Sequence, residues 1–283
     1  MKSSLDMHFN SWNTFSGKLY LQIKIRTIMV NDLILVAREA GEIIKEGFGK
    51  NISIEYKSGE NNLVTEIDKK SEQVIIDFIQ KKYPKHNILA EERGELRKES
   101  EYLWVIDPLD GTSNFAHGLP IFSVSIGLQR NDITIAGVIY DIMRDVLYSA
   151  EFGSGAYANG KKVSVSTTSK LSQSMLVTGF PYNVKENPEY AFERFEIITK
   201  NARAVRRLGS AAIDFCYVAS GVFDGFWEVH LHPWDVCAGK LIVEEAGGKV
   251  TDFLGKTIGL DSKKILATNL LIHNQMIELL KMD

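Results

Sequence analysis

The segment WVIDPLDGTSNF places two acidic residues, Asp107 and Asp110, directly after a β-type run, Tyr102–Ile106. Pro108 has a fixed φ and biases Asp107 towards extended backbone, and Gly111 permits tight curvature beside a ligand. The two carboxylates can therefore converge. Two anions about 4 Å apart repel by roughly 4 kcal/mol at an effective dielectric of 20, so such a pair implies a shared proton or a cation. Magnesium, which prefers oxygen ligands and substrate phosphates, is the simpler answer.

Other acidic residues occur where they can join this pair. Glu91 and Glu92 follow the apolar run ILA, and Asp235 opens a predicted helix. Each also has a plain structural interpretation, because Glu91 and Glu92 fit a solvated charge run and Asp235 fits a helix cap. Asp68 forms the pattern of a capping box with Thr65. Spacing alone does not decide between these interpretations.

Four segments, NLVTEID, ILAEERGE, WVIDPLDGTSNF and PWDVCAGKLIVEEAGG, stand in an order that closely resembles the signature of the inositol monophosphatase family. Members of that family are magnesium-dependent, typically lithium-sensitive phosphomonoesterases. The resemblance extends over about residues 30–282. It implies an α/β (α+β) fold, the layered α/β/α/β/α sandwich of the sugar phosphatases, with the metal site at the seam between the two halves. It also implies a homodimer.

The resemblance also assigns roles to particular residues. It implies that two or three Mg²⁺ ions are held by Glu91, Asp107, the backbone carbonyl of Leu109, Asp110 and Asp235. The catalytic residues it implies are Asp68, Thr112 and Glu91, with the Thr112 hydroxyl between the Asp68 carboxylate and the attacking water. The substrate contacts that it implies are Asp110, Gly111, Thr112, Gly209, Ser210, Ala211, Glu228 and Asp235.

Periodicity predicts the elements that must position these residues. Helical spacing starts at Asn31 and ends near Gly47, and a second helix is expected from Thr65 to about Tyr83. Short β-rich runs then predict an antiparallel sheet: YLWVID, FSVSIGL, ITIAGVIY, VLYSAEF and VSVS. GSGAYANG, residues 153–160, is interpreted as a turn because its glycines lack the GxGxxG spacing.

After about Met175 the pattern becomes α/β. Strands are expected at MLVTGF, AVRRLG and FDGFWEV, and helices at ENPEYAFERFEIITK, SAAIDFCYVASG and DVCAGKLIVEEAGG. We expect residues 29–170 and 171–283 to form two halves of one domain. Residues 1–28, basic and poor in acids, are expected to be a disordered extension or to precede a start at Met29, with a transit-peptide pattern as the alternative.

Composition excludes several classes of protein. The chain has 283 residues and a net charge of -3, which does not favour a nucleic-acid surface. Only two cysteines occur, so a disulfide framework is excluded and a cytoplasmic location is expected. No apolar run is long enough to cross a membrane.

The leading hypothesis is a magnesium-dependent phosphatase that hydrolyses inositol monophosphate or a similar sugar or polyol phosphate. Within the same chemistry, fructose 1,6-bisphosphate, 3'-phosphoadenosine nucleotides and histidinol phosphate are alternative substrates. Glu228 favours a polyol leaving group, because a carboxylate accepts hydrogen bonds from hydroxyls. A hypothesis of another class is a regulatory binding protein that uses the phosphatase fold as a scaffold.

Overall fold

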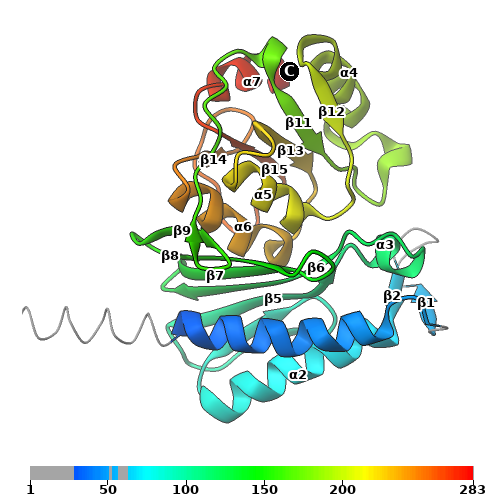
Figure 1. The fold of residues 1–283 in the computed structure, drawn as a ribbon, viewed down its shortest axis with the longest axis vertical. Helices are drawn as coiled ribbons and strands as arrows, with labels where there is room; N and C mark the ends of the chain where they lie inside the picture. The colour runs from blue at the N-terminus through cyan, green and yellow to red at the C-terminus, as the bar shows by residue number, and fades with distance from the viewer. Residues whose placement is uncertain (1–28, 51–52, 57–62, 283) are drawn as a thin grey trace, which may run out of the picture.

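Two sheets and three groups of helices alternate as five layers in the computed structural model, which describes residues 29–50, 53–56 and 63–282 (Figure 1). A first helix, residues 29–47, and α2 (Glu66–Lys82) cover one face of the larger sheet. Between the sheets lie α5 (Ala211–Ala219) and α6 (Pro233–Glu245), and α4 (Ala191–Asn201) and α7 (His273–Leu280) cover the far face of the smaller sheet. The predicted layered sandwich is confirmed. The proposed extension, residues 1–28, lies outside the described residues.

The larger sheet has eight strands in the order β10-β9-β8-β7-β6-β5-β3-β4. All neighbours are antiparallel except β3 and β5, which run parallel. The strands are β3 (Asn87–Ala90), β4 (Gly94–Leu96), β5 (Tyr102–Asp110), β6 (Ser123–Arg130), β7 (Ile133–Asp141), β8 (Val146–Glu151), β9 (Gly155–Ala158) and β10 (Lys161–Lys162). The predicted antiparallel sheet is confirmed. A separate two-stranded sheet joins β1 (Ile54–Tyr56) to β2 (Leu63–Thr65).

Two predictions in this region are wrong. Residues 153–160 are not a single turn, because Gly155–Ala158 form β9 and only Asn159 and Gly160, both with positive φ, make the turn into β10. The VSVS run, residues 163–166, is not a strand. The N–H of Val163 bonds to Ala156 in the larger sheet, whereas the N–H of Val165 bonds to Ala246 at the end of α6, so no ladder with one strand forms.

The smaller sheet has five strands in the order β12-β11-β13-β15-β14. They are β11 (Met175–Thr178), β12 (Ala204–Arg206), β13 (Gly225–Val229), β14 (Lys249–Thr251) and β15 (Lys264–Thr268). The helix expected over residues 186–200 begins only at Ala191. Short 3-10 turns precede it, η1 (Leu171–Gln173), η2 (Val184–Glu186) and η3 (Pro188–Tyr190), and left-handed backbone at Asn187, Glu189 and Tyr190 breaks the helical path.

The first helix and α2 pack on the larger sheet through their apolar faces. Leu33, Val36 and Ala37 of the first helix are fully buried, as are Ile75 and Ile79 of α2. Each fully buried aliphatic side chain contributes roughly 1.5–3 kcal/mol through burial. This packing fixes α2 against β5, the strand that carries Asp107 and Asp110.

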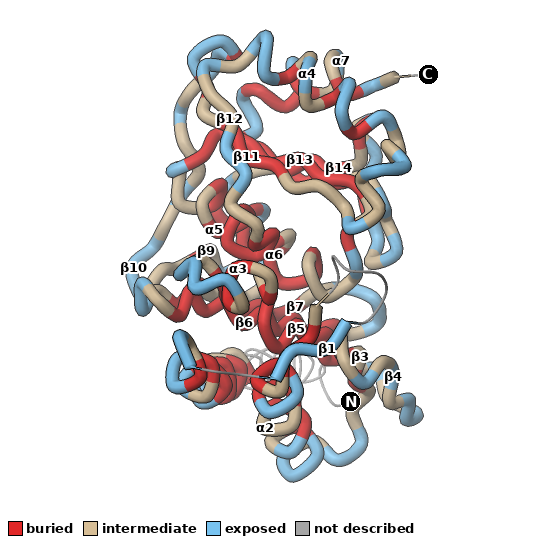
Figure 2. The backbone as a smooth tube through the Cα atoms, turned by 90° about the vertical axis from the view of Figure 1, so that its right-hand side faces the viewer, coloured by how far each residue is buried: buried red, intermediate tan, exposed pale blue. Residues whose placement is uncertain are grey.

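Helix α6 lies directly on the opposite face of the larger sheet, in the buried centre of the molecule (Figure 2). A Cβ at Gly127 would lie 2.4 Å from Cys237 Sγ, and one at Gly137 would lie 3.0 Å from Ala238 Cα. Glycine at these two sheet positions therefore permits the close approach. The first turn of α6, which contains Asp235, is held beside the ends of the central strands. Both cysteines are free and buried.

Candidate active site

Asp68 serves as both a helix cap and a site residue. Its Oδ2 accepts hydrogen bonds from the N–H of Thr65 (2.9 Å) and the Thr65 hydroxyl (2.5 Å), which confirms the predicted capping box. Its Oδ1 accepts a hydrogen bond from Thr112 Oγ1 at 3.0 Å. The start of α2 is thus joined to the loop after β5.

A β-bulge in β5 presents Asp107 and Asp110 on the same side of the sheet. Asp107 pairs with Ser125 and Asp110 with Ser123, so two residues of β5 stand opposite one of β6. The strand expected to end at Ile106 therefore continues to Asp110. Pro108 lies in the bulge, where a missing N–H costs no ladder bond.

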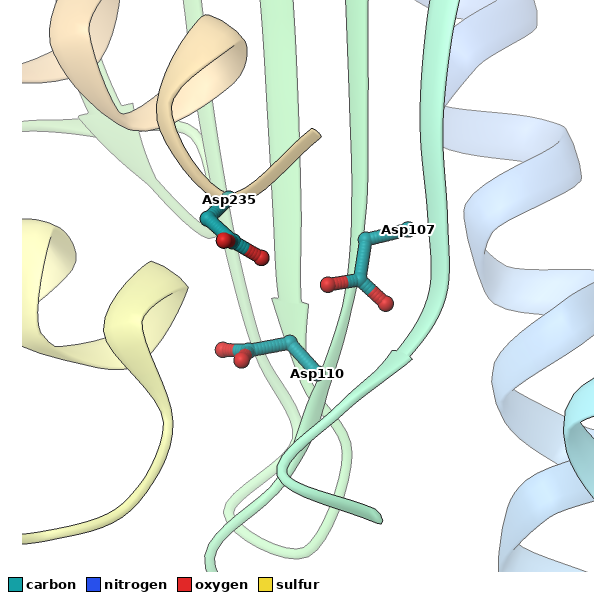
Figure 3. Close-up of side chains that lie close together, drawn as sticks. All are labelled: Asp107, Asp110 and Asp235. Carbon is teal, nitrogen blue, oxygen red and sulfur yellow. The ribbon is translucent and has the colours of Figure 1, made fainter. Parts of the chain in front are cut away.

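Three carboxylates, from Asp107, Asp110 and Asp235, meet at the seam between the two sheets (Figure 3). One oxygen from each lies within 4.8 Å of the others. Each carboxylate is also anchored by the backbone: Asp107 Oδ1 accepts from the N–H of Leu109 (3.0 Å), Asp110 Oδ2 from that of Ala212 (2.8 Å), and Asp235 Oδ2 from that of His232 (2.7 Å). A backbone N–H thus fixes the position of each carboxylate in the pocket.

Glu91 lines the same pocket but does not belong to the three-carboxylate cluster. It follows β3, and its N–H donates to the carbonyl of Ile106 in β5 at 3.1 Å. The negative charge of Glu91 raises the pKa of Asp107. The next residue, Glu92, donates its N–H to Glu72 Oε2 at 2.8 Å. Of the four ligand side chains expected from the sequence, three are clustered and the fourth stands beside them.

The electrostatics of the cluster favour a cation. Burial raises the pKa of Asp107 well above its usual range, and the charges of Glu91, Asp110 and Asp235 raise it further. Burial also raises the pKa of Asp110 to about 6, although the Ser210 hydroxyl and the Ala212 N–H oppose the shift. The pKa of Asp235 is raised by burial and by the charge of Asp110. No positively charged side chain is among the main causes of the pKa shifts of these three carboxyl groups.

These donors fit a hard divalent cation. Carboxylate oxygens at this spacing, two of the three residues being buried, are ligands that such ions prefer. The carbonyl of Leu109 adds a neutral oxygen. Thr112 Oγ1 lies 3.0 Å from that carbonyl and 3.0 Å from Asp68 Oδ1, and one hydroxyl proton serves only one acceptor at a time. When the proton goes to Asp68, the Leu109 oxygen is available to a cation.

The expected substrate contacts surround one pocket. It is lined by Asp110, Gly111, Thr112, Gly209, Ser210, Ala211, Glu228 and Asp235 among others. Gly111 has a φ of 94° and begins the short helix α3 (Thr112–Ala116), as its predicted role in a tight curve requires. A Cβ at Gly179 would lie 2.2 Å from Glu228 Oε2, so glycine there allows the Glu228 carboxylate to approach the loop after β11.

The pocket also contains residues outside the predicted ligand, catalytic and substrate-contact sets. Asp214 of α5 lies in an apolar helical pattern that gives no sign of a pocket. Tyr182 follows β11 and lines the pocket. Arg207 lines the pocket, whereas the Arg206 guanidinium donates to the Val205 carbonyl. Arg207 lies beyond the end of β12 (Ala204–Arg206), in the segment that leads to the pocket residues Gly209 and Ser210.

Comparison with known proteins identifies the family. The model of the inositol monophosphatase family matches residues 28–281. The chain is 43% identical over 241 residues to Nus factor SuhB of Pasteurella multocida, covering 84% of this chain and 90% of that protein. It is 43% identical over 238 residues to inositol-1-monophosphatase of Synechocystis sp., covering 84% and 83%.

A solved structure of inositol monophosphatase from Anabaena superposes with a TM-score of 0.81 at 42% identity, covering 90% of this chain and 95% of that one. The fold, the acidic pocket at the seam and these relatives agree with one another. The chain belongs to the inositol monophosphatase family of metal-dependent phosphatases, and it is a phosphomonoesterase.

Proposed function

We propose that the chain is a magnesium-dependent phosphatase that hydrolyses inositol monophosphate or a similar small polyol phosphate. The observation that carries this proposal is the clustering of the Asp107, Asp110 and Asp235 carboxylates in the pocket, each held in place by a backbone N–H. Glu91 and the Leu109 carbonyl complete the proposed ligand set for two or three ions. Four carboxylates repel a phosphate dianion until cations neutralise them.

Magnesium bound by these oxygens would supply the positive charge that neutralises the phosphate and makes water a better nucleophile. The residues of the chain have separate tasks. Asp68 accepts a hydrogen bond from the Thr112 hydroxyl. The lone pairs of Thr112 Oγ1 can then accept a hydrogen bond from the attacking water. As the water attacks phosphorus, its proton passes to Thr112 and the Thr112 proton passes to Asp68.

The proton acceptor is suited to this task. Burial raises the pKa of Asp68 to about 6, although hydrogen bonds from Thr65 and Thr112 oppose the shift. A base with a pKa near the working pH takes a proton more effectively than an ordinary aspartate. In the proposed site, Glu91 acts with Asp68 and Thr112, and the backbone at Gly111 and Thr112 receives the phosphate oxygens.

The proposed leaving group is a polyol because an acid, Glu228, lines the pocket together with Gly209, Ser210 and Ala211. Carboxylates accept hydrogen bonds from hydroxyls. The relative from Synechocystis and the structure from Anabaena both bear the name inositol monophosphatase. These observations favour a polyol over fructose 1,6-bisphosphate, 3'-phosphoadenosine nucleotides or histidinol phosphate.

Phosphate release from a panel of monophosphates tests the proposal. The panel contains inositol 1-phosphate, fructose 1,6-bisphosphate, a 3'-phosphoadenosine nucleotide and histidinol phosphate, each with millimolar magnesium or with chelator, and with or without lithium. We expect the fastest release from inositol 1-phosphate, only with magnesium, and inhibition by lithium. Faster release from another member of the panel, or release in chelator, would refute the substrate or the metal respectively.

A regulatory role is the second candidate, favoured by the name Nus factor SuhB of the relative from Pasteurella multocida. A purely regulatory protein would release no phosphate from any panel substrate. The intact carboxylate cluster supports catalysis instead. The two roles are separable, because Asp110→Asn should remove turnover while leaving a surface used for binding unchanged.

The oligomeric state follows from the family resemblance alone, so a homodimer is proposed and is tested by light scattering of the purified chain. No helix in the described ranges is long and apolar enough to cross a membrane. We also propose a cytoplasmic location, which fractionation of the source cells would test.

A further inference from the structure

Two buried acids form one wall of the pocket away from the carboxylate cluster. Asp214 lies on α5 and Glu228 on β13, and both line the pocket. The exposed fraction is 1% for Asp214 and 8% for Glu228. Asp214 Oδ1 has no hydrogen-bond partner among the described residues. Burial raises the pKa of Glu228 to about 8, and no hydrogen bond from the described residues opposes this shift.

Without a bound ligand, the burial of these two acids costs free energy. A buried acceptor without a donor costs about 1–3 kcal/mol, and more when it is charged. Burial raises the pKa of Asp214 well above its usual range, and the charges of Glu228 and Asp110 add to the effect. Arg207 supplies an opposing positive charge. A ligand with hydroxyl groups would give both acids the partners that the protein does not.

The position of Asp214 relative to the reaction centre follows from the geometry of α5. The Ser210 hydroxyl and the Ala212 N–H hold Asp110, and the N–H of Asp214 donates to the carbonyl of Ser210 at 3.1 Å. Asp214 is therefore one helical turn beyond Ser210. Four residues rise about 6 Å along a helix, so Asp214 lies farther along α5 than the residues that hold Asp110.

We propose that Asp214 is a specificity-determining residue that hydrogen-bonds a hydroxyl of the leaving group, beside the hydroxyl bound by Glu228. This inference rests on the proposed phosphatase function and deepens it. A hydroxyl both donates and accepts, so it pairs with a carboxylate or with a carboxylic acid. A second phosphate is repelled by two acids, and an ammonium group would stand close to Arg207. Polyol monophosphates are thus the class that this wall selects.

The test compares two substrates on the magnesium-loaded enzyme. Inositol 1-phosphate carries hydroxyls on its leaving group, whereas phenyl phosphate carries none. Asp214→Ala should lower kcat/KM for inositol 1-phosphate by about 10- to 100-fold, mainly through KM, which is the loss of one hydrogen bond to an ionisable group. Phenyl phosphate should change by less than about twofold on the same reasoning. Asp214→Asn, which keeps the shape, should have an intermediate effect.

Asp141 offers a matched control. It is also a buried carboxyl group with an oxygen lacking a hydrogen-bond partner in the described chain, but it contacts Arg144 and Tyr217 and does not line the pocket. Asp141→Asn should leave the ratio of the two substrates unchanged. An equal loss on both substrates in the Asp214 variants, or an unchanged ratio, would overturn the inference while leaving the phosphatase function standing. A wild-type enzyme inert on every monophosphate would instead overturn the function, and the inference with it.

Discussion

Replacing Glu72 with alanine should weaken metal binding although Glu72 does not line the pocket. Its side chain is fully buried on α2, one turn after Asp68. Glu72 Oε2 accepts the N–H of Glu92 at 2.8 Å, and Oε1 lies 3.5 Å from Arg93 Nε. The preceding residue, Ser71, donates from its Oγ to the carbonyl of Pro108 at 2.9 Å. Helix α2 therefore contacts two of the three segments that carry proposed ligands, namely β5 and the residues that follow β3.

The expected magnitude follows from these contacts. A hydrogen bond to a charged acceptor contributes about 1.5–3 kcal/mol. Losing it releases the backbone beside Glu91, and changes in the groups that orient metal ligands typically cost about 10- to 100-fold in affinity or activity. We therefore expect manganese affinity, and the magnesium concentration needed for half-maximal activity, to worsen by about tenfold or more in Glu72→Ala.

Calorimetric titration of the metal-free protein with manganese measures this effect without relying on turnover. Asp77→Ala is the matched control, because Asp77 is an exposed acid on the same helix. Circular dichroism and thermal unfolding report any general loss of stability. Wild-type manganese affinity in a Glu72→Ala protein that is less stable would refute the reasoning, since Glu72 would then support only the fold.

Three further predictions follow from single contacts. Asp110→Asn should reduce phosphate release below detection with an unchanged circular dichroism spectrum, because asparagine keeps an acceptor for the Ala212 N–H but brings no negative charge; near-normal release would remove Asp110 from the site. Gly179→Ala should raise KM for inositol 1-phosphate and spare phenyl phosphate, because its Cβ would lie 2.2 Å from Glu228 Oε2; equal kinetics on both substrates would argue against a substrate contact by Glu228. Burial lowers the pKa of His273 from 6.5 to about 4, so between these pH values the unfolded chain binds a proton that the folded chain does not. The free energy of unfolding should therefore fall by about 3 kcal/mol from pH 6.5 to 4 through this group; urea denaturation of His273→Gln should lack that part of the slope, and identical slopes would contradict it.

Sequence patterns were sufficient to predict the structure of segments that are determined by residues close along the chain. The capping box of Asp68 is confirmed because Thr65 and Asp68 are close along the chain. The extended run before Asp107 is confirmed for the same reason, although the bulge that carries the strand on to Asp110 depends on pairing with β6. The layered fold required the family resemblance as well as periodicity.

Sequence patterns did not predict the structure where residues far apart in the chain determine it. Residues 163–166 alternate like a strand, but their hydrogen bonds are divided between a strand and a helix end. Asp214 was overlooked because an acid within an apolar helical pattern gives no hint that Glu228, on another element, shares its pocket. The roles proposed for the ligand and substrate residues stay predictions, since proximity in the fold does not establish what they bind.

The three clustered carboxylates come from β5 and from the first turn of α6, which are far apart along the chain. A nascent chain that ends before α6 would hold only part of the cation site, however well its first sheet had formed. The site is completed only when α6 settles against Gly127 and Gly137. Capture of a divalent ion during refolding would therefore report the docking of α6 on the larger sheet, which the formation of β5 alone does not bring about.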